Sequence, residues 1–277
     1  MQPDTPPIAL IALDLDGTIL NDQFQISPRV LNALQAAVKR GVRVTIATGR
    51  PVEVTRPFVK LVGVNAPAIS MQGGVIYDFA TETTLRELTL PHDLACALTE
   101  LEAQHPAWQV VVYGDDALYV SSIRYAPDFY AALLGANLQV HADLCAAINR
   151  RDPQKVLYII PPQDAPLAVS ELNHIVGDRA MVVQSHALFV EVNPLDAHKG
   201  AGLARLAADL GIPREQVMAI GDQDNDVTML EWAGLGVVMS NGSVASKLVA
   251  NWIAPSITDD GAAVAIERFV LSDPRTP

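Results

Sequence analysis

Residues 8–20 have the sequence IALIALDLDGTIL, an apolar run that ends in two aspartates one residue apart. The stretch from Ile8 to Leu13 is short and almost wholly apolar, which is typical of a buried parallel strand. Asp14 and Asp16 come at its end, where two carboxylates are costly to bury unless a cation or a proton compensates them. A plain turn at the end of a strand, where Asp and Gly are common, is the alternative interpretation.

The chain has 277 residues, enough for one large domain or two modest ones. Its apolar runs are interrupted too often for a membrane span, so we expect no membrane partner. The net charge of −12, without a cluster of lysines and arginines, argues against binding of nucleic acid. The N-terminal MQPDTPP lacks a basic segment followed by an apolar stretch, which predicts a cytoplasmic protein without a secretory signal.

The chain has two cysteines, Cys96 and Cys145. Their spacing indicates neither a disulfide framework nor a metal-binding motif. Cys96 lies among several leucines, and we expect it to be a small residue of the core.

The first third of the chain alternates predicted strands and helices. Ser27 and Pro28 suit the start of a helix, and Gly41 suits its end. A buried strand is expected at 42–47, followed by a short helix with a kink or break at Pro57. Strands and helices joined by short links predict right-handed crossovers and a parallel sheet.

From about residue 77 the pattern changes from alternation to hairpins. Residues 108–122 and 180–192 each have two apolar-rich arms around a polar turn, which predicts two hairpins. Helices are expected at 93–104 and 165–176. Hairpins combined with helices indicate a separate α+β domain.

Alternation resumes after residue 198, with strands expected at 217–220 and 235–239. The sequence therefore predicts an α/β protein with a doubly wound, Rossmann-like parallel sheet as its core. We expect this core to comprise residues 1–80 and 190–277. Residues 81–189 would form an inserted α+β cap domain.

Reactive side chains follow several predicted core strands. Asp14 and Asp16 follow the first, Thr48 follows the second, and the strand at 217–220 is followed by Asp222, Asp224, Asn225 and Asp226. In open α/β sheets, sites form outside the carboxyl ends of the strands, so these side chains should converge. A cluster of carboxylates suits a hard cation such as Mg²⁺, and Lys199 could neutralise a phosphoryl oxygen.

The segments DLDGT, ATGR, Lys199 and GDQDND, in this order, resemble the four motifs of the haloacid dehalogenase superfamily. More narrowly, the chain resembles the Cof-like phosphatases, which carry a large α/β cap between the second and third motifs. The resemblance implies a Mg²⁺-dependent phosphatase that acts on a small phosphorylated metabolite. Sugar phosphates are the expected substrate class.

The resemblance also implies a role for each motif residue. Asp14 would be the nucleophile, and Asp16 would be the general acid and base. The Asp14 carboxylate, the Asp16 backbone carbonyl and Asp222 would hold Mg²⁺. The other implied roles are phosphoryl binding by Thr48, Gly49 and Lys199, a phosphate or substrate contact by Asn225, and orientation of Lys199 or of metal-bound water by Asp226. Arg50 would contact substrate phosphate or form an ion pair at a helix start.

Two segments depart from the family pattern. Gln72-Gly73-Gly74 stands where Asn-Gly-Ala is frequent, and Ser240-Asn241-Gly242 stands where relatives often have Gly-Asn-Ala. The first change puts in doubt a substrate contact assigned to the Asn. Neither change touches the four motifs.

Two other functions would use the same motifs. A sugar-phosphate phosphotransferase or mutase also fits Asp16 as an acid and base. A non-catalytic phosphosugar-binding regulator would have lost one or more catalytic residues, and none is missing here. A dinucleotide-dependent oxidoreductase is disfavoured, because DLDGTIL is not a glycine-rich phosphate loop.

Overall fold

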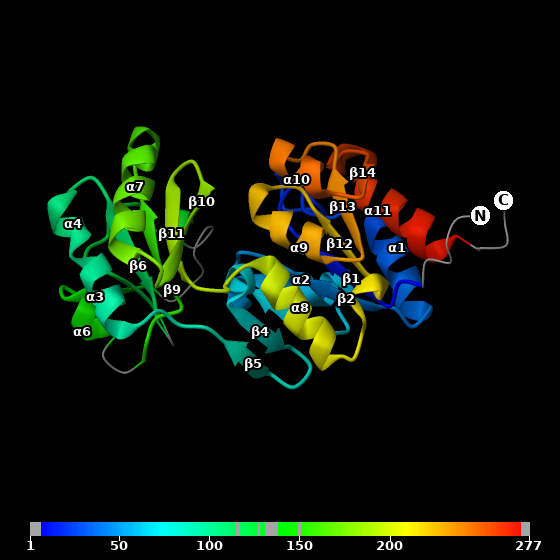
Figure 1. The fold of residues 1–277 in the computed structure, drawn as a ribbon, viewed down its shortest axis with the longest axis horizontal. Helices are drawn as coiled ribbons and strands as arrows, with labels where there is room; N and C mark the ends of the chain where they lie inside the picture. The colour runs from blue at the N-terminus through cyan, green and yellow to red at the C-terminus, as the bar shows by residue number, and fades with distance from the viewer. Residues whose placement is uncertain (1–6, 115–116, 127, 131–137, 149–150, 273–277) are drawn as a thin grey trace. The chain divides into compact units, whose positions relative to one another are not determined.

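The computed structural model describes residues 7–114, 117–126, 128–130, 138–148 and 151–272. The chain divides into two compact units (Figure 1). The first unit is formed by both ends of the chain, residues 1–86 and 198–277, and the second by residues 87–197. Within the described ranges, each helix is too short or too polar to cross a lipid bilayer.

The first unit is built on a five-stranded parallel sheet with the strand order β14-β13-β12-β1-β2. Its strands are β1 (Leu10–Leu13), β2 (Arg43–Ile46), β12 (Val217–Gly221), β13 (Leu235–Met239) and β14 (Trp252–Ala254). Leu13 pairs with Ile46 on one side and with Ile220 on the other. Because the chain proceeds from β1 and from β12 in opposite directions across the sheet, the topological switch point lies between these two strands.

Helices cover both faces of this sheet. Ile11 and Leu13 pack into a core with α1 and α11, whereas Leu10 and Ala12 pack into a second core with α8 and α9. The helices of this unit are α1 (Pro28–Lys39), α2 (Val52–Val62), α8 (Lys199–Asp209), α9 (Val227–Trp232), α10 (Val244–Val249) and α11 (Gly261–Ile266). Helices α1 and α11 come from opposite ends of the chain and lie side by side (Figure 1). The predicted doubly wound α/β core is confirmed.

In this unit, local sequence signals place the helices well, with an exception at Pro57. Helix α1 begins as predicted, with Pro28 at its first turn and the Val30 amide donating to the Ser27 hydroxyl. Of the kink or break predicted at Pro57, the break is wrong, because α2 continues through this residue. Pro57 is exposed, so water can hydrate the Glu53 carbonyl, which loses its helical partner.

A small sheet of three strands follows the second core strand. It consists of β3 (Ala68–Ser70), β4 (Val75–Asp78) and β5 (Thr83–Glu87). Strand β3 touches the core sheet through an isolated bridge between Ala47 and Ile69, and it pairs antiparallel with β4. The tight turn at residues 71–73 reverses the chain before β3 can extend along the parallel sheet.

The second unit is a six-stranded sheet with helices packed on it. Its strand order is β10-β11-β9-β6-β7-β8, antiparallel except for the β7–β8 pair. The strands are β6 (Gln109–Tyr113), β7 (Leu118–Val120), β8 (Leu138–Val140), β9 (Lys155–Ile159), β10 (Ala180–His186) and β11 (Phe189–Pro194). The helices are α3 (His92–Thr99), α4 (Leu101–Gln104), α6 (Leu144–Ala147) and α7 (Ala165–Val176). Both predicted hairpins are confirmed, as β6–β7 and β10–β11.

The helix predicted over 93–104 is two helices, α3 and α4. The Thr99 hydroxyl donates to the Cys96 carbonyl, and the Glu100 amide donates to the Ala97 carbonyl. A threonine hydroxyl that takes a helix carbonyl competes with the helical ladder, which accounts for the interruption.

The prediction for Cys96 is wrong as well. Cys96 is half-buried and forms a disulfide with Cys145, which links α3 to α6. The two cysteines are 49 residues apart, and the packing of α3 against α6 brings them together. Local sequence carries no signal for such a pairing.

Candidate active site

Asp14 and Asp222 lie at the switch point, just beyond the carboxyl ends of neighbouring strands. The Asp14 amide donates to the Ile220 carbonyl at 2.9 Å, which extends the β1–β12 ladder to the carboxylate. Both acids are buried, with 6% and 1% of their surface exposed. Together with Asp226 they offer carboxylate oxygens that all lie within 4.8 Å of one another. The fold thus gathers acids that are far apart in sequence.

Lys199 is the cation of this cluster and is fully buried. Its ammonium donates to Asp14 Oδ1 at 2.6 Å and to Asp226 Oδ1 at 2.5 Å. Three ionised carboxylates and one ammonium would leave two negative charges in a buried place. Because uncompensated buried charge is strongly unfavourable, the cluster matches a divalent cation in both charge and donor type.

Burial and charge shift the pKa of several groups in the cluster. Burial, reinforced by Asp226 and Asp222, raises the pKa of Asp14 well above its usual value, although Lys199 opposes this. Burial and Asp226 raise the pKa of Asp222 to about 6. Burial alone would lower the pKa of Lys199, but Asp14 and Asp226 outweigh it and raise that pKa, so the ammonium stays charged.

Asp226 is occupied by hydrogen bonds within the protein. Its Oδ2 accepts from the backbone amides of Asp222 and Gln223, at 2.7 and 3.0 Å, while Oδ1 accepts from Lys199. These contacts fix both the loop after β12 and the lysine. Asp14 and Asp222 therefore remain the better candidates for metal ligands, and the neighbouring Asp224 is exposed.

The Gly-Thr pair after the first two aspartates positions Asp222. The Thr18 hydroxyl donates to Asp222 Oδ1 at 2.9 Å, and the side-chain amide of Gln223 donates to Oδ2 at 2.8 Å. Gly17 has a φ of 82°, and a Cβ at this residue would lie 2.4 Å from Asp222 Oδ2. The sequence analysis did not predict that Thr18 belongs to the site, although Thr18 is the last residue of the DLDGT motif.

Asp16 does not join the carboxylate cluster. Its side chain is 52% exposed and accepts two hydrogen bonds from the Arg50 guanidinium, at 2.6 and 2.8 Å. The guanidinium carbon lies 5.5 Å from the centre of the Phe24 ring and 5.4 Å from that of Phe58. Of the two interpretations of Arg50, the structure shows an ion pair, with Asp16 as the partner.

Thr48, Gly49 and Asn225 meet at a glutamine that sequence reasoning did not select. Gln72 is buried, has a φ of 58°, and accepts a hydrogen bond from Asn225 at 3.2 Å. Its backbone amide donates to the Thr48 carbonyl, and its side-chain Nε2 lies against Gly49, where a Cβ would come within 2.5 Å. The Thr48 hydroxyl accepts from the Arg50 amide. A left-handed backbone at a buried non-glycine residue is a mark of functional sites.

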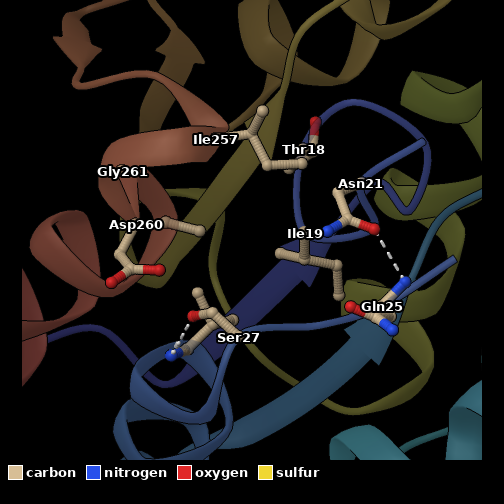
Figure 2. Close-up of a pocket in the computed structure, with 10 residues that line it drawn as sticks. Thr18, Ile19, Asn21, Gln25, Ser27, Ile257, Asp260 and Gly261 are labelled. Atoms are coloured by element: carbon tan, nitrogen blue, oxygen red, sulfur yellow. Dashed lines mark hydrogen bonds between the residues drawn. The ribbon is translucent and has the colours of Figure 1, made fainter. Parts of the chain in front are cut away.

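A separate hollow lies between the loop after β1 and the start of α11 (Figure 2). Thr18 lines it, but of the described residues Asp14, Asp222 and Lys199 do not. Figure 2 shows two of its polar side chains, Asn21 and Ser27, hydrogen-bonded to nearby backbone amides. These side chains serve local structure, so we assign the chemistry to the carboxylate cluster.

Comparison with known proteins agrees with this geometry. The family model of haloacid dehalogenase-like hydrolases matches residues 11–266. The 5-amino-6-(5-phospho-D-ribitylamino)uracil phosphatase YitU of Bacillus subtilis (strain 168) is 29% identical over 267 residues, which cover 94% of this chain and 97% of that protein. The pyridoxal phosphate phosphatase YbhA of Escherichia coli (strain K12) is 27% identical over 270 residues, covering 95% and 97%.

A solved structure gives the same result. The crystal structure of a haloacid dehalogenase-like hydrolase from Bacteroides thetaiotaomicron superimposes with a TM-score of 0.84 at 28% identity, covering 94% of this chain and 99% of that one. The match to the family model extends over both units and all four motifs. The chain therefore belongs to the haloacid dehalogenase-like hydrolases and, within them, to the Cof-like phosphatases.

Proposed function

We propose that this enzyme hydrolyses phosphate monoesters of small metabolites in a magnesium-dependent reaction, through an aspartyl-phosphate on Asp14. The observation that carries the proposal is the buried contact between Lys199 and Asp14, inside a cluster of acids at the switch point. A carboxylate that attacks an anionic phosphate must stay ionised and be shielded from it. An ammonium and a divalent cation at the same carboxylate meet both needs.

The donors present fit Mg²⁺. They are buried carboxylate oxygens, and their cluster carries two negative charges that Lys199 does not neutralise. Mg²⁺ binds through one or two carboxylates, water and substrate phosphate. Asp14, Asp222 and the backbone carbonyl of Asp16 would hold the ion. When bound, it would neutralise charge on the phosphoryl oxygens.

The first chemical step would use Asp14 and Asp16. Because the hydrogen bond from Lys199 occupies Asp14 Oδ1, we assign Oδ2 as the atom that attacks phosphorus. The bond between phosphorus and the leaving oxygen breaks, and Asp16 donates a proton to that oxygen. The pair with Arg50 is the one that the ionised carboxylate makes, so one Asp16 oxygen would leave the guanidinium to carry the proton. The other oxygen would stay held by Arg50, which would orient this acid.

The second step would return the enzyme to its starting state. A water oxygen attacks phosphorus while Asp16 accepts the water proton, and the bond between phosphorus and Asp14 breaks. Inorganic phosphate leaves with the water oxygen. Asp16 thus ends with the proton that its next turnover requires.

Several other groups would bind the transferring phosphoryl group. These are the Lys199 ammonium, the Thr48 hydroxyl, the Gly49 amide and the Asn225 side chain. Gln72 holds Asn225 and lies against Gly49, so it would support this set. Donors fixed in place before the reaction stabilise the developing charge without reorganisation.

For the substrate we propose a sugar phosphate or a related small phosphomonoester. The names of YitU and YbhA specify phosphatases of small phosphorylated metabolites, which supports this class. The inserted region, residues 81–189, would act as a cap that sets specificity. We expect the enzyme to act in the cytoplasm.

A hydrolysis screen tests the proposal. Purified enzyme is incubated with phosphorylated metabolites and Mg²⁺, and both free phosphate and isomeric products are measured. We expect phosphate release that stops with EDTA and returns when Mg²⁺ is added. An isomeric product without free phosphate would show that the enzyme is a mutase and not a hydrolase. Full activity without metal would refute the proposal that the carboxylate cluster binds a catalytic metal ion.

A further inference from the structure

The second unit contains another group of metal-ligating side chains. His92, Cys96 and Cys145 each offer one donor atom, and the three atoms lie within 4.8 Å of one another. His92 and Cys96 are one helical turn apart on the same face of α3, and Cys145 lies in α6. His92 is exposed and both cysteines are partly exposed, so ions from solution can reach all three.

The imidazole of His92 has the environment of a zinc ligand. Its Nε2 lies 3.6 Å from Cys96 Sγ. In a tetrahedral zinc site, a nitrogen and a sulfur ligand lie roughly 3.6 Å apart, given zinc–nitrogen and zinc–sulfur bonds of about 2.0 and 2.3 Å. The other ring nitrogen, Nδ1, faces Asp152 Oδ1 at 3.8 Å, which is longer than a hydrogen bond. A small rotation of the ring or the carboxylate would complete the outer contact that such ligands usually make.

The disulfide explains why Cys96 and Cys145 lie together, but it does not explain why the imidazole of His92 lies beside them. A cystine needs no nitrogen donor beside it, whereas a zinc ion needs nitrogen or further sulfur ligands. The Cα atoms of Cys96 and Cys145 are 4.7 Å apart. After reduction, the two sulfurs need to separate only to roughly 3.8 Å, the distance between two thiolates on one zinc ion.

We propose that His92, Cys96 and Cys145 bind a soft divalent cation such as Zn²⁺ when their disulfide is reduced. Two molecules of a thiol such as glutathione would reduce the disulfide to two cysteine thiols and leave as a glutathione disulfide. Metal binding then releases the two thiol protons to solvent. Three protein ligands leave a fourth position for water.

The two states of this site exclude each other. The sulfurs bind metal as thiolates, so the cystine cannot serve as a ligand pair. In a reducing cytoplasm, where disulfides are rare, the metal would take over the link between α3 and α6. In an oxidising environment the disulfide would hold the same two helices.

Cobalt spectroscopy tests the site on the full chain without a histidine tag. The protein is reduced, freed of reductant without oxygen, and titrated with Co²⁺. We expect the near-ultraviolet band of thiolate-to-cobalt charge transfer to saturate at one equivalent, and Zn²⁺ to abolish it. Co²⁺ bound at Asp14 and Asp222 gives no such band, because those ligands are oxygens.

Variants separate the proposed ligands from bystanders. His92→Ala should weaken Co²⁺ binding by at least about tenfold, and Asp152→Asn by about tenfold, since outer partners contribute 10- to 100-fold. His174→Ala, which changes an exposed histidine of α7, should leave the Co²⁺ affinity unchanged. Circular dichroism checks that each variant is folded.

Three outcomes would overturn the proposal. They are no thiolate band in the reduced protein, equal Co²⁺ affinity in His92→Ala and His174→Ala, or the same band in the oxidised protein. As an independent measure, Zn²⁺ should raise the melting temperature of the reduced protein by more than that of the oxidised protein, because both forms carry the carboxylate cluster and only the reduced form has the thiolates.

Discussion

Arg50 holds both carboxylate oxygens of Asp16, at 2.6 and 2.8 Å. An ion pair of an exposed acid would ordinarily contribute little. This pair differs because the planar guanidinium matches the carboxylate in two places and lies near two aromatic rings, Phe24 and Phe58. We infer that Arg50 fixes the direction in which the proposed acid points.

Arg50→Lys should lower kcat by about tenfold, a fraction of the 10²–10⁴ that general acid catalysis contributes. Lysine keeps the charge but lacks the planar fork that binds the two oxygens in parallel and fixes their direction. The loss should be larger for alkyl phosphates, whose leaving oxygen needs a proton, than for p-nitrophenyl phosphate. Arg56→Lys is the matched control, because Arg56 also holds both oxygens of an exposed acid, Glu82. Equal losses for both substrates would leave Arg50 a purely structural role.

Asp14→Asn should abolish turnover, by more than about 1,000-fold, because an amide oxygen is a poor nucleophile. The fold should persist, since the two side chains have nearly the same shape. Phosphate release and circular dichroism check the two expectations. Asp224→Asn, a change of an exposed acid in the same site loop, should keep its activity. Substantial phosphatase activity in Asp14→Asn would end the covalent scheme.

Lys199→Ala should destabilise the metal-free protein by about 3–5 kcal/mol at neutral pH, because it leaves buried carboxylates without their cation. The loss should shrink as the pH falls. Burial already raises the pKa of Asp14, and once protonated that carboxyl no longer needs a cation. Denaturant unfolding in EDTA over a range of pH measures this. Lys60→Ala, at an exposed position of α2, should change the free energy of unfolding by less than about 0.5 kcal/mol.

Magnesium affinity should depend on pH through Asp222. Burial and Asp226 raise the pKa of Asp222 to about 6, and the carboxyl must lose its proton to bind the ion. Below about pH 6 a proton competes with Mg²⁺ for the Asp222 carboxylate, so the Mg²⁺ affinity should fall by up to about tenfold per pH unit. Above that pH Asp222 is already ionised, so it should not raise the affinity further. Calorimetric titration on both sides of the pKa tests the expectation. A constant affinity across it would contradict the assignment of Asp222 as a ligand.

Much of the core could be predicted because its signals are local. An apolar run ending in Asp14 marks a strand end, and Ser27 with Pro28 marks a helix start. The order of four motifs then indicated which strand ends should meet. β14 (Trp252–Ala254) was missed, because three residues next to a proline give too short a pattern.

The remaining features depend on contacts between distant residues. The Cys96–Cys145 disulfide, the Asp16–Arg50 pair and the contacts of Gln72 each follow from the packing of separate elements. The site residue Thr18 belongs to a recognisable motif, but the partner of its hydroxyl lies in the loop after β12, 204 residues away. A motif can mark such a residue but cannot say what it touches.

The switch point between β1 and β12 also sets the order in which the enzyme can be completed during translation. Asp14 leaves the ribosome early, but its lysine follows 185 residues later and β12 later still. The nascent chain therefore carries the proposed nucleophile without its cation until more than two thirds of the protein has been made. A fragment that stops short of Asp222 should be inert, however well its first strands and helices fold.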